Sequence, residues 1–80
     1  MRNLTIYSRP GCHLCEHAIE QVEPMCHSAG VALRVVDVDA DDAWREQYGL
    51  RIPVICGSGQ ELSAGPLDLG RIARWLQKDT

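Results

Sequence analysis

The chain has 80 residues, 45% of them hydrophobic and 24% charged, with a formal net charge of −3 at pH 7. This length supports one hydrophobic core, so we expect residues 1–80 to fold as a single monomeric domain. The scattered Lys and Arg residues argue against a nucleic-acid partner, while the short apolar stretches and the lack of a signal pattern predict a cytoplasmic protein without membrane association.

The first predicted elements are a strand, a loop and a long helix. Residues 3–7 alternate between polar and apolar side chains, which predicts a strand, and the Ser-Arg-Pro-Gly stretch that follows predicts a loop. Residues 13–29 place apolar side chains at offsets of three and four, a pattern typical of an amphipathic helix. Pro24 is expected to kink this helix or to end its regular part early, and Gly30 is a natural C-terminal cap.

A second strand and a short helix are predicted next. Residues 31–38 form a nearly continuous apolar run, which predicts a buried strand parallel to the first. The intervening helix would then make a right-handed crossover between the two strands. Aspartates within residues 39–42 offer N-cap carboxylates for a short helix that carries Trp44 and Tyr48 and ends at Gly49.

Two short strands and a last helix complete the predicted fold. Residues 52–55 favour a third strand, and a Gly-rich turn leads to a weak fourth strand around residues 61–63. The last helix is expected to follow an N-cap at Asp68 and to direct four apolar side chains inward: Leu69, Ile72, Ala73 and Leu76. The element order β-α-β-α-β-β-α predicts an α/β fold, with a four-stranded mixed sheet and helices on both faces.

Cys12 and Cys15 lie three positions apart, directly after the first loop. A pair at this spacing can contribute to a zinc site, staple a small secreted fold, or exchange electrons through a disulfide. A zinc site needs four ligands, usually as two close pairs, and the other two cysteines, Cys26 and Cys56, are isolated from each other. Since no secretory signal supports a disulfide framework, redox chemistry is the favoured interpretation and no metal ligands are assigned.

The start of a helix gives the two thiols different expected roles. The first N–H groups of a helix lack internal partners and carry the positive end of its dipole, so a thiolate at Cys12 would be stabilised there. Cys15 falls on the apolar stripe of the helix and is expected to point inward, where it can resolve a mixed disulfide formed by Cys12. Gly11 would let a partner's backbone come close, while Arg9 and a protonated His13 would place positive charge beside Cys12.

Two segments carry a resemblance to a known family. They read Tyr-Ser-Arg-Pro-Gly-Cys-His-Leu-Cys at residues 7–15 and Tyr-Gly-Leu-Arg-Ile-Pro-Val-Ile at residues 48–55. With the element order, these motifs make the chain similar to the glutaredoxin-like branch of the thioredoxin superfamily. The resemblance implies a thioredoxin fold, a nucleophilic Cys12, a resolving Cys15 and a cis peptide bond before Pro53.

The resemblance also implies a site for glutathione or substrate. In glutaredoxins a basic residue at the place of Arg9 often lies near the glutathione carboxylate, and Ile52, Pro53 and Asp68 would serve the same site. The chain departs from the glutaredoxin pattern between its cysteines, where a proline and an aromatic residue are usual. It also lacks the Gly-Gly pair that precedes the acidic residue. Both glutathione and a reductase therefore stay open as the source of electrons.

The sequence thus predicts a thiol–disulfide oxidoreductase that reduces protein or small-molecule disulfides, binds no cofactor, and has glutathione as a candidate reductant. Two alternatives remain: a metal or iron–sulfur binding or delivery module that uses Cys12 and Cys15, and a thioredoxin-fold adaptor without catalysis. Cys26 lies on the apolar stripe of the first helix and is expected in the core. For Cys56, which ends a strand, packing is favoured over a reactive exposed thiol.

Overall fold

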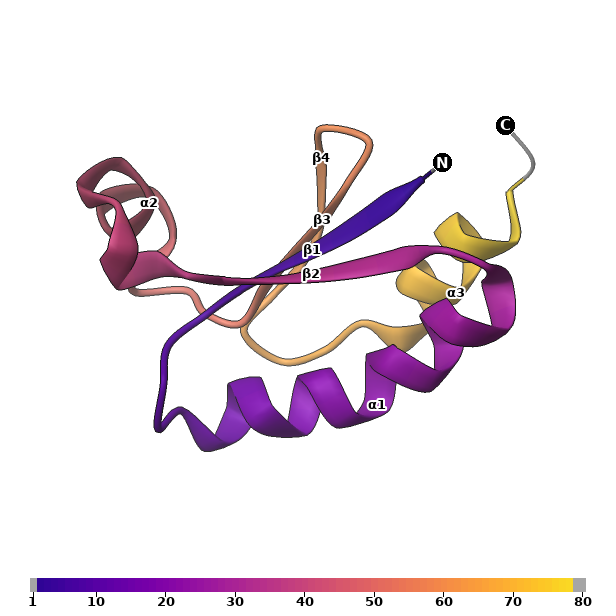
Figure 1. Cartoon of the computed structure of the whole chain (residues 1–80), viewed down its shortest axis with the longest axis horizontal. Helices are drawn as coiled ribbons and strands as arrows, with labels where there is room; N and C mark the ends of the chain where they lie inside the picture. Colours follow the sequence, from indigo (N-terminus) through magenta and orange to yellow (C-terminus); the bar gives the residue numbers. More distant parts are fainter. Residues whose placement is uncertain (1, 79–80) are drawn as a thin grey trace.

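The computed structural model describes residues 2–78. The element order matches the prediction, with one added turn of 3-10 helix after the second strand (Figure 1). The elements are β1 (Asn3–Ser8), α1 (His13–Ala29), β2 (Ala32–Asp37), η1 (Val38–Ala40), α2 (Asp42–Tyr48), β3 (Val54–Gly57), β4 (Gln60–Ala64) and α3 (Leu69–Gln77).

The four strands form one mixed sheet in the order β2-β1-β3-β4. β1 and β2 are parallel, with Ile6 opposite Val35, whereas β3 is antiparallel to both β1 and β4. The crossover through α1 connects the parallel pair, as the sequence pattern predicts, but β2 is a partly exposed edge strand and not the buried strand expected. The predicted α/β class, the mixed sheet and the glutaredoxin-like order of elements are therefore confirmed.

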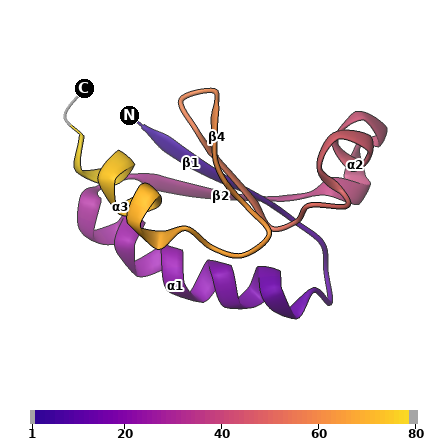
Figure 2. The same cartoon turned by 180° about the vertical axis from the view of Figure 1, so that it is seen from behind.

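The hydrophobic core lies between one face of the sheet and the helices α1 and α3. Leu4 and Ile6 of β1 and Ile55 of β3 are fully buried on this face, because alternate residues of a strand point to the same side. Val22 of α1 and Ile72 of α3 are fully buried against them. Figures 1 and 2 show α1 and α3 side by side under this face of the sheet.

The short helix α2 lies beyond the end of β1 and covers the other face of the sheet there. Tyr48 stacks on Tyr7 with ring centroids 4.1 Å apart, and Trp44 meets the same ring edge-on at 6.1 Å. Further along this face, Asn3 and Arg34 are exposed. Helices therefore contact both faces, but α2 covers only the end near Tyr7.

The structure decides two expectations about the helices. Of the two effects expected of Pro24, an early end of the regular helix is not observed, because α1 runs on to Ala29, with Pro24 on its exposed side. In α3, Leu69 is 39% exposed, and Trp75, which is 6% exposed, is buried in its place.

None of the helices within residues 2–78 is both long and apolar enough to cross a membrane.

Candidate active site

The loop after β1 delivers Cys12 to the N-terminus of α1. The Cys12 N–H donates to the Arg9 carbonyl at 3.2 Å, closing a turn in which Gly11 adopts a φ of 81°, a conformation that favours glycine. Cys12 is the N-cap residue of α1, as expected, and its Sγ accepts a hydrogen bond from the Cys15 N–H at 3.2 Å. The helix terminus thus supplies a backbone donor to the Cys12 sulfur.

Cys15 lies one helical turn further along and is buried, with 1% of its surface exposed. Burial raises the pKa of the Cys15 thiol to about 12, and the neighbouring Cys12 sulfur adds to the shift. Cys12 is only half-buried. The pair therefore presents one sulfur that a partner can reach and a second that stays protonated behind it.

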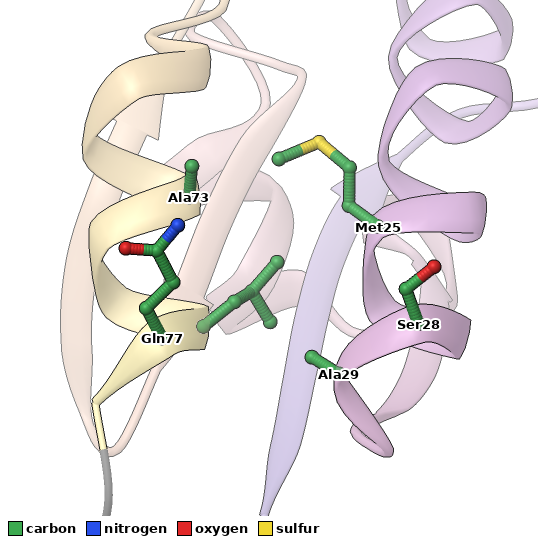
Figure 3. A pocket seen from close by; sticks show the side chains of 6 residues that line it. Met25, Ser28, Ala29, Ala73 and Gln77 are labelled. Atoms are coloured by element: carbon green, nitrogen blue, oxygen red, sulfur yellow. The ribbon is translucent and has the colours of Figure 1, made fainter.

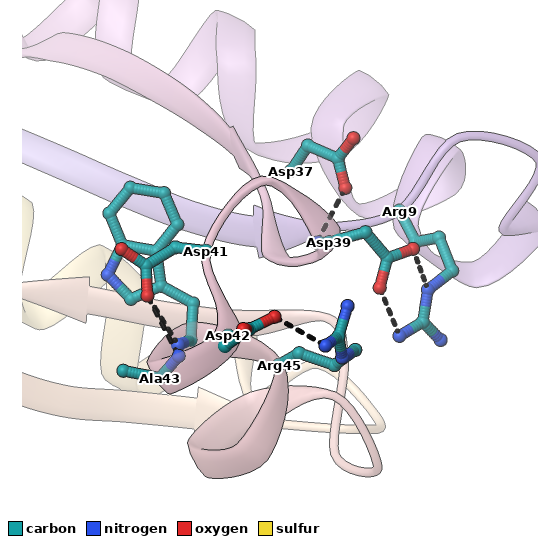
Figure 4. Close-up of polar contacts among 8 residues, drawn as sticks. Arg9, Asp37, Asp39, Asp41, Asp42, Ala43 and Arg45 are labelled. Carbon is teal, nitrogen blue, oxygen red and sulfur yellow. Dashed lines mark hydrogen bonds and ion pairs between the residues drawn. The ribbon is translucent and has the colours of Figure 1, made fainter.

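Arg9 extends from the same loop and forms a bidentate ion pair with Asp39 of η1 (Figure 4). Its Nε lies 2.7 Å from Oδ2 and its Nη2 lies 3.0 Å from Oδ1 of that carboxylate. The Arg9 guanidinium holds the pKa of Asp39 below its usual range. Asp37 supports the arrangement, because its Oδ1 accepts the Asp39 N–H at 2.9 Å. Arg9 thus has an internal anion as its partner, and its contribution to glutathione binding stays a prediction.

The Ile52-Pro53 peptide bond is cis, as the resemblance to glutaredoxins implies. Val54 pairs with Tyr7 in antiparallel register, so Pro53 lies at the end of the sheet where β1 leads into the cysteine loop. The Gly65 N–H donates to the Pro53 carbonyl at 3.0 Å and links this segment to the end of β4. The roles of Ile52 and Pro53 in substrate binding stay predictions.

Asp68 is the N-cap of α3, and its Oδ1 accepts the Arg71 N–H at 3.0 Å. Its own N–H donates to the Ser63 hydroxyl at 3.0 Å, so the start of α3 is fixed to β4. The expected cap is therefore observed, and a role of Asp68 toward glutathione stays a prediction. His13 follows Cys12 on the exposed side of α1, with Nδ1 4.0 Å from Oε1 of Glu16.

A family model for the glutaredoxin-like domain (DUF836) matches residues 3–77. The chain belongs to this glutaredoxin-like family. A curated relative, an uncharacterized protein of Mycobacterium tuberculosis, is 26% identical over 80 residues that cover 94% of this chain and 82% of the relative.

Solved structures agree with the family assignment. A solution structure of a protein from Nitrosomonas europaea has a TM-score of 0.84 and 31% identity, covering 95% of this chain and 92% of that one. A crystal structure of a protein from X. campestris has a TM-score of 0.73 and 38% identity, covering 91% and 93%. A thioredoxin from Thermosipho africanus, at 13% identity, has a TM-score of 0.65 with 94% of each chain covered. The glutaredoxin-like domain therefore has the thioredoxin fold.

The two other thiols of the glutaredoxin-like domain lie away from the pair. Cys26, at 1% exposure, is in the core, as expected, and burial raises the pKa of its thiol. Cys56 is half-buried on β3, beside Thr5, on the face of the sheet opposite the core. Within residues 2–78, no group of three or more His, Cys, Asp or Glu side chains is arranged to hold a metal ion.

Sequence reasoning misses a groove of about 270 Å³ that opens beside Cys15, between α1 and the edge strand β2. The signal that could have found it is Ser8, a polar residue on the strand face that otherwise carries Leu4 and Ile6. The groove, called the β2 groove below, is lined by Ser8, Arg9, Pro10, Cys15, Glu16, Ile19, Val35 and Asp37.

A separate apolar hollow of about 340 Å³ lies between the C-terminal halves of α1 and α3 (Figure 3). Met25 and Ala29 line it from α1, and Ala73 and Gln77 line it from α3. It lies toward the opposite end of α1 from Cys12 and contains none of the predicted site residues. The candidate active site is therefore the region around the cysteine pair.

Proposed function

We propose that the protein is a dithiol–disulfide oxidoreductase that reduces disulfides through Cys12 and Cys15. One observation carries this proposal: the two sulfurs share the first turn of α1 but have unlike surroundings. Cys12 is half-buried and accepts a backbone N–H, whereas Cys15 is buried with a raised thiol pKa. This is the asymmetry that an attacking and a resolving thiol require.

The reaction begins at Cys12. Its thiolate attacks one sulfur of a substrate disulfide, forms a mixed disulfide and releases the second substrate sulfur as a thiolate. Cys15 then gives up its proton and attacks the Cys12 sulfur, so that a Cys12–Cys15 disulfide forms and the substrate leaves with both sulfurs reduced. Two electrons pass to the substrate in each cycle, and an external thiol or reductase returns them.

The environment of Cys15 suits the second step of the reaction, in which Cys15 attacks the mixed disulfide. Burial is the main reason for its raised pKa, and the adjacent Cys12 sulfur contributes further. Once Cys12 is part of a mixed disulfide it no longer carries negative charge, so the contribution of Cys12 to the raised pKa falls away. Cys15 therefore becomes easier to deprotonate at the step that needs its thiolate.

The electron donor is a small thiol such as glutathione or a protein reductase, and no bound cofactor takes part in the steps above. The residues proposed to contact a bound thiol are Ile52, Pro53 and Asp68, at the end of the sheet where the cysteine loop begins. Such a cycle suits a reducing compartment such as the cytoplasm, where a thiol pool resets the pair.

The test is a disulfide reduction assay with the variants Cys12→Ser and Cys15→Ser. We expect Cys12→Ser to abolish reduction, because Cys15, the remaining sulfur of the pair, is buried and cannot reach a substrate disulfide. Cys15→Ser should accumulate a mixed disulfide on Cys12, visible by intact-protein mass spectrometry after addition of an oxidised substrate. Cys56→Ser, which removes a thiol remote from the pair, serves as the matched control and should reduce substrate like the wild type.

Two results would contradict the proposal. A wild-type protein that reduces neither peptide nor small-molecule disulfides would leave the adaptor interpretation in its place. Protein purified under reducing, anaerobic conditions with stoichiometric metal, lost in Cys12→Ser, would instead support a metal-binding module.

A further inference from the structure

We propose that the β2 groove binds a lysine or arginine side chain of the substrate polypeptide, next to the disulfide that the cysteine pair reduces. This inference rests on the proposed function and adds a substrate class to it. The preferred substrate is a disulfide in a basic polypeptide segment rather than an anionic thiol compound such as oxidised glutathione.

The walls of the groove fit the aliphatic stem of a long basic side chain. Ile19 of α1 lines the groove from the helix side, and Val35 of β2 lines it from the edge of the sheet. Val35 pairs with Ile6 and so belongs to the helix-covered face, yet it is 52% exposed, because β2 is an edge strand. Lysine and arginine cover apolar surface of this kind with their methylene groups.

The groove also contains a polar side chain. Ser8 is only 7% exposed, and it lines the groove. A serine hydroxyl in this position offers an oxygen that can accept a hydrogen bond from a ligand. A lysine ammonium or an arginine guanidinium can donate to the Ser8 oxygen. Because Cys15 lines the same groove, such a side chain would lie beside the resolving thiol.

The charges around the groove are complementary to a cation. Glu16 lines it from α1 and Asp37 from the end of β2. Arg9 also lines the groove, but its charge is balanced by the bidentate pair with Asp39. His13, 4.0 Å from Glu16, would offset that carboxylate only when protonated. With Arg9 balanced, Glu16 and Asp37 leave the groove acidic, which attracts a basic side chain and repels the carboxylates of oxidised glutathione.

The experiment compares three synthetic peptides that share one intramolecular disulfide and differ only in the residue beside it, which is lysine, methionine or glutamate. For the wild type we expect kcat/KM to be about five-fold higher with the lysine peptide than with the glutamate peptide, the size of one favourable exposed ion pair. The preference should weaken as salt is added, because salt screens exposed charges.

Isosteric variants locate the source of the preference. Asp37→Asn keeps an oxygen that can accept the Asp39 N–H, and Glu16→Gln keeps the length of its side chain, so each removes charge alone. Both should reduce the preference for lysine, measured as the ratio of kcat/KM for the lysine peptide to kcat/KM for the glutamate peptide. Glu23→Gln, which removes an exposed carboxylate of α1 outside the groove, is the matched control and should keep the preference. Val35→Lys places a cation in the groove and should reverse the preference toward glutamate.

The outcomes separate this inference from the proposed function. Equal kcat/KM for the three peptides, or a lysine preference that survives both Asp37→Asn and Glu16→Gln, would overturn the groove assignment and leave the oxidoreductase proposal standing. If no peptide and no small-molecule disulfide is reduced, both proposals fall.

Discussion

At the scale of single residues, Cys12 and Cys15 divide the chemistry of the site between them. Both belong to the first turn of α1, yet one is half-buried and the other is 1% exposed. Withdrawal from water favours the uncharged thiol, so Cys15 holds its proton well above the ordinary thiol pKa of 9.0. The folded protein therefore stabilises the thiol form of Cys15 relative to its thiolate form.

The raised pKa of Cys15 predicts a stability that depends on pH. The unfolded chain releases this proton near pH 9.0, whereas the folded protein keeps it until about pH 12, so the free energy of unfolding should fall as pH rises through this window. In the reduced protein, Cys15 should lower the free energy of unfolding by up to about 1.4 kcal/mol for each pH unit in this window, and Cys15→Ala should remove this contribution. Denaturant unfolding measured in steps across the window checks this, and parallel profiles for the two proteins would contradict it.

The sequence predicts residue roles where they depend on local structure. The cap position of Cys12 and the inward direction of Cys15 follow from the helix pattern alone, and both are observed. The pairing of Arg9 with Asp39 joins residues 30 positions apart and depends on how the ends of β1 and β2 align. The position of Ser8 in the β2 groove likewise depends on the packing of α1 over the strand, which no local pattern describes.

At the scale of elements, the close packing of α3 on the end of β3 depends on a glycine. A Cβ added to Gly57 would lie 2.6 Å from the Cε2 and Cζ2 atoms of Trp75, much closer than carbon atoms pack. The absence of a side chain at Gly57 therefore lets the indole lie against the strand, and Trp75 reaches 6% exposure.

Gly57→Ala should destabilise the protein by about 1 to 3 kcal/mol, because the buried ring has to move to make room. Gly70→Ala is the matched control in α3, since its added Cβ would meet nothing closer than 3.7 Å. Alanine in a helix is favoured over glycine by up to about 1 kcal/mol, so this variant should be slightly more stable than the wild type. Thermal and urea unfolding measure both effects, and a stable Gly57→Ala protein would refute the packing argument.

Periodicity locates these elements better than it locates their buried faces. The bounds predicted for α1 from its apolar spacing agree with the structure, because a long helix repeats its pattern several times. In α3, which is half as long, the pattern favoured Leu69 as an inward residue, whereas the structure buries Trp75. The decisive contact is with Gly57 on another element, which the helix pattern does not contain.

At the scale of the whole molecule, the two ends of the described chain are tied together by Arg2. Its Nη1 donates to the Trp75 carbonyl at 2.9 Å and its Nη2 to the Leu76 carbonyl at 2.8 Å. The guanidinium also lies 4.7 Å from the Trp75 ring centroid. Arg2 thus satisfies carbonyls at the C-terminal end of α3 and fixes this helix to the start of β1.

Arg2→Met should lower the free energy of unfolding by about 1 to 3 kcal/mol, because both carbonyls lose a charged donor. Arg2→Lys keeps the charge but not the forked geometry, so its stability should lie between those of the other two proteins. Urea unfolding with circular dichroism detection provides the comparison. Equal stability of all three proteins would show that the contact contributes nothing.

The global topology was predictable because the order of short elements, the parallel crossover and the two family motifs all indicate the same fold. Contacts between side chains that lie far apart in the sequence were not predictable in the same way. Arg2 reads as an ordinary basic residue at the start of the chain, and its partners lie 73 and 74 positions away. Only the assembled sheet brings them together.

The positions of the two indole rings give the molecule a pair of natural fluorophores. Trp75 lies under Arg2 at the start of β1, and Trp44 lies beside Tyr7 near the end of the same strand. When Trp44 is replaced with phenylalanine, the remaining emission comes from Trp75, near the start of β1. When Trp75 is replaced, the remaining emission comes from Trp44, near the end of β1 where a substrate disulfide would dock. Binding at the cysteine pair should therefore change the signal of Trp44 while that of Trp75 stays constant.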